Sequence, residues 1–134
     1  MAAVGYLDSS CVVAITLGEP GARAAVTALR TCERLVSSNL LEAEVRAALA
    51  RERVTARSET FAGLDWILPD RQLTPEIDRV LAAGALRGAD LWHLACALYL
   101  DPAAGDVAFL TLDAKQQRVA AALGFNTARI RAVL

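Results

Sequence analysis

Residues 3–17 have the sequence AVGYLDSSCVVAITL, in which a single aspartate, Asp8, lies between two apolar segments. The first segment is typical of a buried strand, and the second is typical of a short helix that ends before Gly18 and Pro20. A carboxylate buried between such segments is costly unless it has a partner. Asp8 is therefore either the N-cap of the helix or part of a metal or catalytic site. Asp8 alone does not distinguish these alternatives, so the other acids of the chain have to be considered.

A second stretch, VAFLTLDAKQQRVAAALG at 107–124, repeats this order of apolar strand, aspartate and helix, with Asp113 in the place of Asp8. Another buried strand is predicted at 34–38, RLVSS. Apolar strands that alternate with helices predict an α/β fold, here a three-layer α/β/α sandwich around a central, mainly parallel sheet. Because parallel strands present their carboxyl ends at one edge of the sheet, Asp8 and Asp113 are expected at the same edge.

The remaining pattern of apolar residues, prolines and glycines completes the predicted order of elements. Residues 71–74 are interpreted as a weak strand or a connector, and residues 125–130 as a last edge strand. Further helices are predicted at 20–30, 38–53, 56–68, 75–85 and 89–100. We expect one domain over residues 1–134, because this length is typical of a single domain.

The composition narrows the class of protein. With 55% hydrophobic residues and a mean hydropathy of +0.37, the chain is not disordered. No apolar run approaches the roughly 20 residues of a membrane span, and no basic residue precedes the first apolar stretch, so neither a membrane anchor nor a signal peptide is expected. Its three widely spaced cysteines favour reduced thiols in a cytoplasmic protein. A net charge of −1 is not typical of a nucleic-acid binder.

Asp90 opens the predicted helix ADLWHLACALYL and has two interpretations. It is either an N-cap or an acid directed toward the sheet edge. His93 lies one turn further along the same helix face. We favour His93 as a hydrogen-bonding residue that orients a neighbour over His93 as a direct metal ligand.

Two glutamates in the helix at 38–53 are distinguished by their neighbours. Glu42 has Arg46 four residues later, the favourable order for an exposed ion pair. Glu44 instead shares the apolar stripe of Leu41 and Val45, where a carboxylate needs a charge partner or a metal unless it reaches past the core to solvent. Glu44 is therefore the preferred site residue.

Asp8, Glu44, Asp90 and Asp113 thus form one candidate cluster. Carboxylates packed together without a cation repel one another, and hard divalent ions such as Mg²⁺ and Mn²⁺ prefer carboxylate and water oxygens. Ser10 and Thr111 flank the strand-end aspartates and either support the site or are ordinary turn and strand hydroxyls. Such a site suits metal-assisted attack of water on a phosphodiester.

The sequence resembles those of the PIN-domain family, and within that family those of VapC-type toxin ribonucleases. The resemblance covers nearly the whole chain through four motifs in order: YLDSS at 6–10, SSNLLEAEVRAAL at 37–49, LRGADLWHLACAL at 86–98 and FLTLDAKQQRVAAALGF at 109–125. The four acids of the family fall on the candidate cluster, with the glutamate on Glu44 rather than Glu42. Ser10, Thr111 and His93 fall on supporting positions.

The resemblance implies an endoribonuclease that depends on Mg²⁺ or Mn²⁺, forms a homodimer and is held inactive by a small cognate antitoxin. On this hypothesis Asp8 and Asp90 hold the principal ion, while Glu44 and Asp113 complete the acidic ring and help deprotonate the attacking water. Trp92 is bulkier than the residue often found between the third acid and the histidine. No second acid closely follows Asp113, which puts a second metal in doubt.

Two other functions stay open on the sequence alone. One is a catalytically silent PIN-fold module that acts through protein contacts, and the other is a structure-specific DNA nuclease. The basic residues Arg46, Arg51, Arg53, Arg57 and Arg87 either contact RNA phosphates or belong to a solvated helix face.

Overall fold

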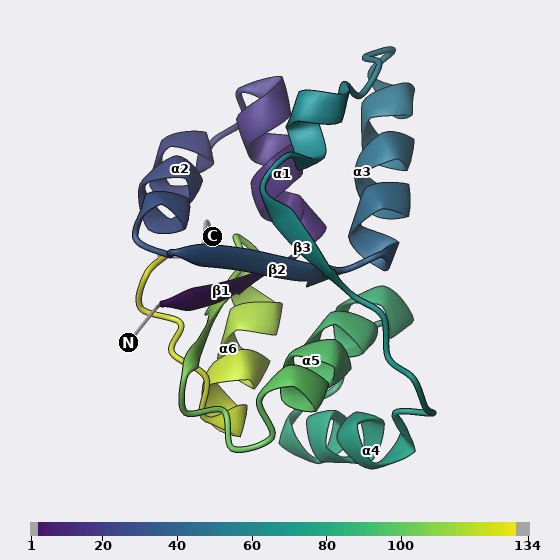
Figure 1. Cartoon of the computed structure of the whole chain (residues 1–134), viewed down its shortest axis with the longest axis vertical. Coiled ribbons are helices and arrows are strands. Elements are labelled where there is room, and N and C mark those ends of the chain that lie inside the picture. The colour runs from purple at the N-terminus through teal and green to yellow at the C-terminus, as the bar shows by residue number, and fades with distance from the viewer. Residues whose placement is uncertain (1–2, 131–134) are drawn as a thin grey trace.

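The computed structural model describes residues 3–130 and places a four-stranded parallel sheet between two layers of helices (Figure 1). The strand order is β3-β2-β1-β4. The strands are β1 Val4–Leu7, β2 Arg34–Ser38, β3 Leu64–Ile67 and β4 Val107–Leu110. The predicted three-layer α/β/α fold is confirmed, and every strand pair in the sheet is parallel.

Each face of the sheet is covered by helices from one half of the chain (Figure 1). One layer consists of α1 Ser9–Leu17, α2 Ala22–Arg30 and α3 Leu40–Arg51. The other consists of α4 Thr74–Ala83, α5 Gly88–Leu100 and α6 Ala114–Leu123. Because side chains alternate along a strand, Tyr6 enters the core beneath α5, whereas Leu7 enters the core beneath α1 and α3.

The described helices include no single one that is long and apolar enough to cross a membrane. The pair α1 and α2 meets that length and composition only when taken together, across a bend of 119°. Buried residues of both helices, among them Cys11 and Ala25, belong to the core under this face of the sheet.

The helix predicted at 56–68 is wrong. This segment forms a short 3₁₀ helix, Ser58–Phe61, followed by the edge strand β3. Phe61, Leu64 and Ile67 recur every three residues and so imitate one face of a helix. Gly63 breaks it with a φ of 81°, a conformation that favours glycine, and strand pairing with β2 then overrides the local pattern.

The two weaker strand predictions have different outcomes. Residues 71–73 connect β3 to α4, which begins at Thr74, so of the two alternatives for 71–74 the connector is confirmed. Residues 125–130 contribute only an isolated parallel bridge between Asn126 and Ala108 of β4. The backbone N–H of Phe109 donates to the Asn126 carbonyl at 2.9 Å, so this segment covers the edge of β4 without adding a full strand.

The ends of β1 and β4 bring together two segments that are about a hundred residues apart in the chain. Leu7 is aligned with Leu110, and the Asp8 N–H donates to the Leu110 carbonyl at 3.2 Å. The residues that follow each strand, Asp8 and Thr111, therefore lie side by side at the carboxyl edge of the sheet.

Candidate active site

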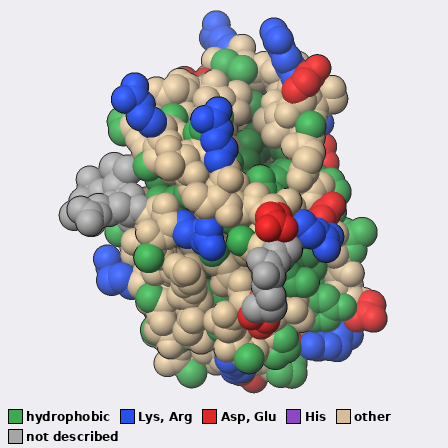
Figure 2. Space-filling model, turned by 60° about the vertical axis from the view of Figure 1, so that its left-hand side comes forward, with side chains coloured by type: hydrophobic (Ala, Val, Ile, Leu, Met, Phe, Trp, Pro, Cys, Tyr) green, Lys and Arg blue, Asp and Glu red, His purple; other side chains and the backbone are tan. Residues whose placement is uncertain are grey.

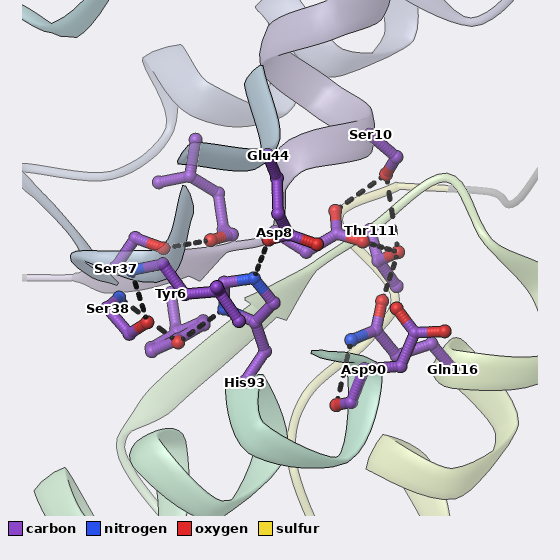
Figure 3. A network of polar contacts seen from close by, with 12 residues as sticks. Tyr6, Asp8, Ser10, Ser37, Ser38, Glu44, Asp90, His93, Thr111 and Gln116 are labelled. Atoms are coloured by element: carbon purple, nitrogen blue, oxygen red, sulfur yellow. Dashed lines mark hydrogen bonds and ion pairs between the residues drawn. The ribbon is translucent and has the colours of Figure 1, made fainter. Parts of the chain in front are cut away.

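Asp8 is the most deeply buried acid at the carboxyl edge of the sheet, with 4% of its surface exposed. It occupies the N-cap position of α1, but its side chain makes no capping hydrogen bond. Instead its carboxylate accepts hydrogen bonds from the Ser10 hydroxyl at 2.6 Å and from the Thr111 hydroxyl at 3.0 Å (Figure 3). Asp8 therefore holds the N-cap position that one alternative predicted, but its carboxylate oxygens accept hydrogen bonds from hydroxyls and do not cap α1.

The burial of Asp8 has an electrostatic cost. The pKa of this carboxyl is raised from 3.8 to about 6, chiefly by loss of hydration and to a lesser degree by the charge of Asp90. The hydrogen bonds from Ser10 and Thr111 and the proximity of His93 act in the opposite direction. At neutral pH the group is ionised, buried and held by uncharged donors.

Glu44 reaches the same edge from α3 and meets His93 from α5 (Figure 3). Glu44 Oε1 lies 2.5 Å from His93 Nε2, and the imidazole is fully buried. The other ring nitrogen, Nδ1, lies 2.7 Å from the Tyr6 hydroxyl. His93 thus contacts a site carboxylate through one nitrogen and the core through the other, which is the orienting geometry favoured from the sequence.

Asp90 lies in the first turn of α5, behind the N-cap residue Arg87, so it is not the helix cap. Its carboxylate has no hydrogen-bonding partner among residues 3–130. Partial burial raises the pKa of this carboxyl, and the charges of Asp113 and Glu44 raise it further, while His93 and Arg87 lower it. The negative charges of Asp113 and Glu44 therefore both act on the Asp90 carboxylate.

Asp113 is the one predicted site acid whose side chain caps a helix. Its Oδ1 accepts the backbone N–H of Gln116 at 2.8 Å, at the start of α6. The residue is exposed, and its second oxygen is free of hydrogen bonds within the described chain. Capping and a role in the site are compatible, because each uses a different oxygen.

Asp8 follows β1, Glu44 lies in the second turn of α3 and Asp90 lies in the first turn of α5, and the three meet at one sheet edge (Figure 3). The fourth predicted acid, Asp113, follows β4 at the same edge, and its charge raises the pKa of Asp90. Within residues 3–130, no three His, Cys, Asp or Glu side chains converge closely enough to form a ready ion site. Their donor chemistry nonetheless suits a hard divalent ion, because the ligands are carboxylates and Asp90 carries the repulsion of two others.

Comparison with known proteins agrees with this arrangement. The family model for the PIN domain matches residues 5–122, a range that holds all four acids. The chain belongs to the PIN-domain family. It is 35% identical over 127 residues to ribonuclease VapC46 of Mycobacterium tuberculosis (strain ATCC 25618 / H37Rv), covering 92% of this chain and 95% of that protein. No solved structure matches the chain at a significant level. The resemblance to VapC-type PIN proteins is confirmed.

Two residues of this PIN domain were missed by reasoning from the sequence, Tyr6 and Gln116. Tyr6 lies in β1, two residues before Asp8, which directly follows the strand; residues two apart along a strand direction point to the same side of the sheet. Gln116 stands three residues after Asp113, the spacing of a capping box. The buried Gln116 amide lies 3.0 Å from the Thr111 hydroxyl and donates to the Asp90 carbonyl at 3.3 Å, joining α5 to α6.

Beside the acids of the PIN domain lies an open depression of about 390 Å³. Ser10, Asp113 and Glu19 are its polar residues, and apolar side chains of α1, of Pro20 in the loop after α1 and of the segment after β4 form the rest. It is lined by Ser10, Val13, Ala14, Glu19, Pro20, Leu112 and Asp113. A chain that ran along the carboxyl edge of the sheet would therefore find an apolar surface next to the carboxylates.

On the face drawn in Figure 2, Lys and Arg side chains stand singly and form no continuous patch. Arg46 is paired with Glu42 at 2.7 Å and lies over the Phe61 ring, 5.1 Å from its centre. Arg51, Arg53 and Arg57 are exposed at the end of α3 and the loop that follows. Whether they contact RNA stays a prediction.

Proposed function

We propose that this PIN-domain protein is a divalent-metal-dependent endoribonuclease and the toxin of a toxin–antitoxin pair. One observation carries the proposal: Asp8, Glu44, Asp90 and Asp113 gather at one sheet edge without a lysine or arginine ion pair to any of them in the described chain. A cation is the usual solution for buried and mutually repelling carboxylates. The similarity to ribonuclease VapC46 supports RNA as the substrate.

On this proposal, Asp8 and Asp90 hold one Mg²⁺ or Mn²⁺ ion, and Glu44 and Asp113 complete the acidic ring. A divalent ion bound there supplies Lewis acidity to the scissile phosphate and brings that anion close to the carboxylates. Ser10 and Thr111 keep the Asp8 carboxylate directed outward through their hydrogen bonds. Glu44 and Asp113 would help remove one proton from the attacking water, whose oxygen bonds to phosphorus as the bond to the 3′ oxygen breaks. The 3′ oxygen takes up a proton from solvent, which leaves a 5′-phosphate and a 3′-hydroxyl.

The depression beside Ser10 and Asp113 is where we place a nucleotide that adjoins the scissile phosphate. Its apolar side chains offer a surface for a base or a ribose, and its polar residues include Asp113 of the acidic ring. The exposed arginines of the α3 end supply phosphate contacts further along the strand. Cleavage under subsaturating RNA is then expected to fall steeply with salt.

We also propose a small antitoxin as the protein partner. The uncompensated acidic ring is a target for an arginine side chain, because a guanidinium binds carboxylates through paired hydrogen bonds. The antitoxin helix would dock on apolar helical surface nearby. A homodimer is proposed on the resemblance alone.

The test is cleavage of an RNA pool by the purified chain with Mg²⁺ or Mn²⁺, with and without EDTA. We expect cleavage that EDTA abolishes, loss of activity in Asp90→Asn, and near-parental activity in Asp78→Asn, a matched change at an exposed position of α4. Cleavage of DNA but not RNA would favour the structure-specific nuclease. Absence of both cleavage and divalent-ion binding would favour the silent interaction module. Either outcome would overturn the proposal.

A further inference from the structure

A chain of hydrogen bonds runs from the core of the PIN domain to Glu44. The backbone N–H of Ser38, at the end of β2, donates to the Tyr6 hydroxyl at 3.1 Å. The Tyr6 hydroxyl lies 2.7 Å from His93 Nδ1, and His93 Nε2 lies 2.5 Å from Glu44 Oε1. Tyr6 and His93 are both fully buried, so this chain is shielded from water until it reaches the carboxylate (Figure 3).

The direction of each bond follows from the donors present. The Tyr6 oxygen already accepts the Ser38 N–H, so its own proton is free to be donated. A tyrosine hydroxyl keeps its proton at neutral pH. Within the described chain, His93 Nδ1 is the acceptor found for it. A ring that accepts at Nδ1 carries its proton at Nε2, where it faces Glu44.

The two rings are also fixed in position. Tyr6 stacks on Phe109 with the ring centres 5.4 Å apart and planes within 9°. It meets His93 edge-on, with the ring centres 5.7 Å apart and planes 72° apart. Because the rings are held by packing, loss of the Tyr6 hydroxyl alone would remove a proton donor and leave the shape of the core in place.

We propose that Tyr6 and His93 are positioning residues for Glu44: the Tyr6 hydroxyl sets the His93 ring in the Nε2–H tautomer, and Nε2–H holds Glu44 Oε1. This leaves Oε2 directed to the acidic ring. The inference deepens the proposed function and rests on it for its effects on Mn²⁺ affinity and on cleavage. Partners of this kind orient ligand groups elsewhere, and their loss weakens metal affinity by about 10- to 100-fold.

The first experiment examines the metal-free protein and needs no activity. His93 is the single histidine of the chain, so ¹⁵N NMR of histidine-labelled protein reports one imidazole. We expect the neutral Nε2–H tautomer in the parent at pH 7.5 and loss of this single tautomer in Tyr6→Phe. A parent ring protonated at Nδ1, or a spectrum unchanged in Tyr6→Phe, would overturn the proposal.

The second experiment measures Mn²⁺ binding by calorimetry in the parent and its variants. We expect Tyr6→Phe and His93→Leu to lower the affinity by about 10-fold or more. His93→Gln, whose amide still offers a donor to Glu44, should recover most of that loss. A merely structural His93 would not distinguish Gln from Leu in this way. Equal Mn²⁺ affinity in the parent and Tyr6→Phe would overturn the proposal, even if His93→Leu fails to fold.

Cleavage assays then separate this proposal from the broader one. Tyr6→Phe should need about 10-fold more Mn²⁺ for half-maximal cleavage, with a maximal rate within about threefold of the parent. A parent that cleaves no RNA would end the ribonuclease proposal, while the NMR and Mn²⁺ measurements would still decide the positioning role. A parent that cleaves RNA, with a Tyr6→Phe variant identical in all three measurements, would end only the positioning role.

Discussion

Three carboxylates on the outer helices and the edge strand differ from those at the carboxyl edge of the sheet in what neutralises them. Glu42, Asp65 and Glu76 each form an ion pair with an arginine, at 2.7, 2.6 and 2.6 Å. The four site acids have no such pair among residues 3–130, and uncharged donors hold the buried ones. Glu42 and Glu44 show the contrast within one helix, two residues apart.

This difference in how the acids are neutralised indicates what kind of group can bind at the carboxyl edge of the sheet. At Glu42, Asp65 and Glu76 an arginine offsets the carboxylate, although exposed pairs of this kind contribute little stability. At the sheet edge, hydroxyls and an imidazole fix the direction of the acids and leave their charge available. The fold thus organises an acidic centre whose negative charge a bound, positively charged group can neutralise.

The largest expected effect comes from removing the charge of the most buried site acid. Asp8→Asn should lower the rate of RNA cleavage by roughly 10³-fold, because about 4 kcal/mol of metal and transition-state stabilisation is lost. Asp65→Asn makes the same chemical change at an arginine-paired acid and should leave the rate within about twofold. The measurement is single-turnover cleavage at saturating Mg²⁺. Equal rates in the two variants would remove the distinction between the two regions.

The next effect concerns stability and has the opposite sign. Burial raises the pKa of Asp8 from 3.8 to about 6, so above pH 6 the folded protein carries the full cost of an ionised buried carboxylate. As the pH falls from 6 toward 3.8, the folded state takes up the proton first and this cost disappears. In EDTA, Asp8→Asn should therefore stabilise the protein at pH 8 by up to about 3 kcal/mol, at 1.36 kcal/mol per pKa unit. The gain should shrink below pH 6.

Urea unfolding at pH 8 and pH 5 measures this change, and Asp65→Asn again serves as the control. A metal-free Asp8→Asn variant that is less stable than the parent at pH 8 would show that Asp8 is a structural acid of the ordinary kind. The comparison between the two regions would then fail on energetic grounds.

The smallest effect comes from the hydroxyl that holds Asp8. Thr111→Val keeps the side-chain shape but removes the donor to Asp8 and the acceptor of the Asp113 N–H. We expect a loss of about 1–3 kcal/mol in the free energy of unfolding, because buried polar groups lose their partners. Thr16→Val, at an exposed hydroxyl of α1, should change it by less than about 0.5 kcal/mol. Similar losses in both variants would mean that the Thr111 hydroxyl contributes no more to the free energy of unfolding than an exposed hydroxyl does.

Much of the fold could be predicted from the sequence because it rests on local patterns. The apolar strands 4–7, 34–38 and 107–110 and the glycines and prolines around the helices are local signals. The parallel order then placed Asp8 and Asp113 at one edge. β3 escaped because a four-residue edge strand whose middle residues, Asp65 and Trp66, are exposed carries little apolar signal of its own.

The residues of the candidate site likewise divide into those that local patterns predict and those that depend on contacts between distant parts of the chain. Helical periodicity separated Glu44 from Glu42, and their side-chain exposures of 22% and 45% agree with that separation. Tyr6 and Gln116 could not be assigned, because their contacts join residues 87 and 26 positions apart and depend on side-chain rotamers. The placement of the four acids followed from topology, whereas their support follows from packing.

The most direct test of the account is the position of an ion. Crystals grown or soaked with Mn²⁺ should give an anomalous peak at the manganese edge, bounded by oxygens of Asp8 and Asp90 and close to Glu44 and Asp113. No peak should lie at the arginine-paired acids Glu42, Asp65 and Glu76. The central claim would be contradicted if no anomalous peak lay at the four site acids. The Mn²⁺ concentration in that experiment must be one that supports RNA cleavage by the same protein.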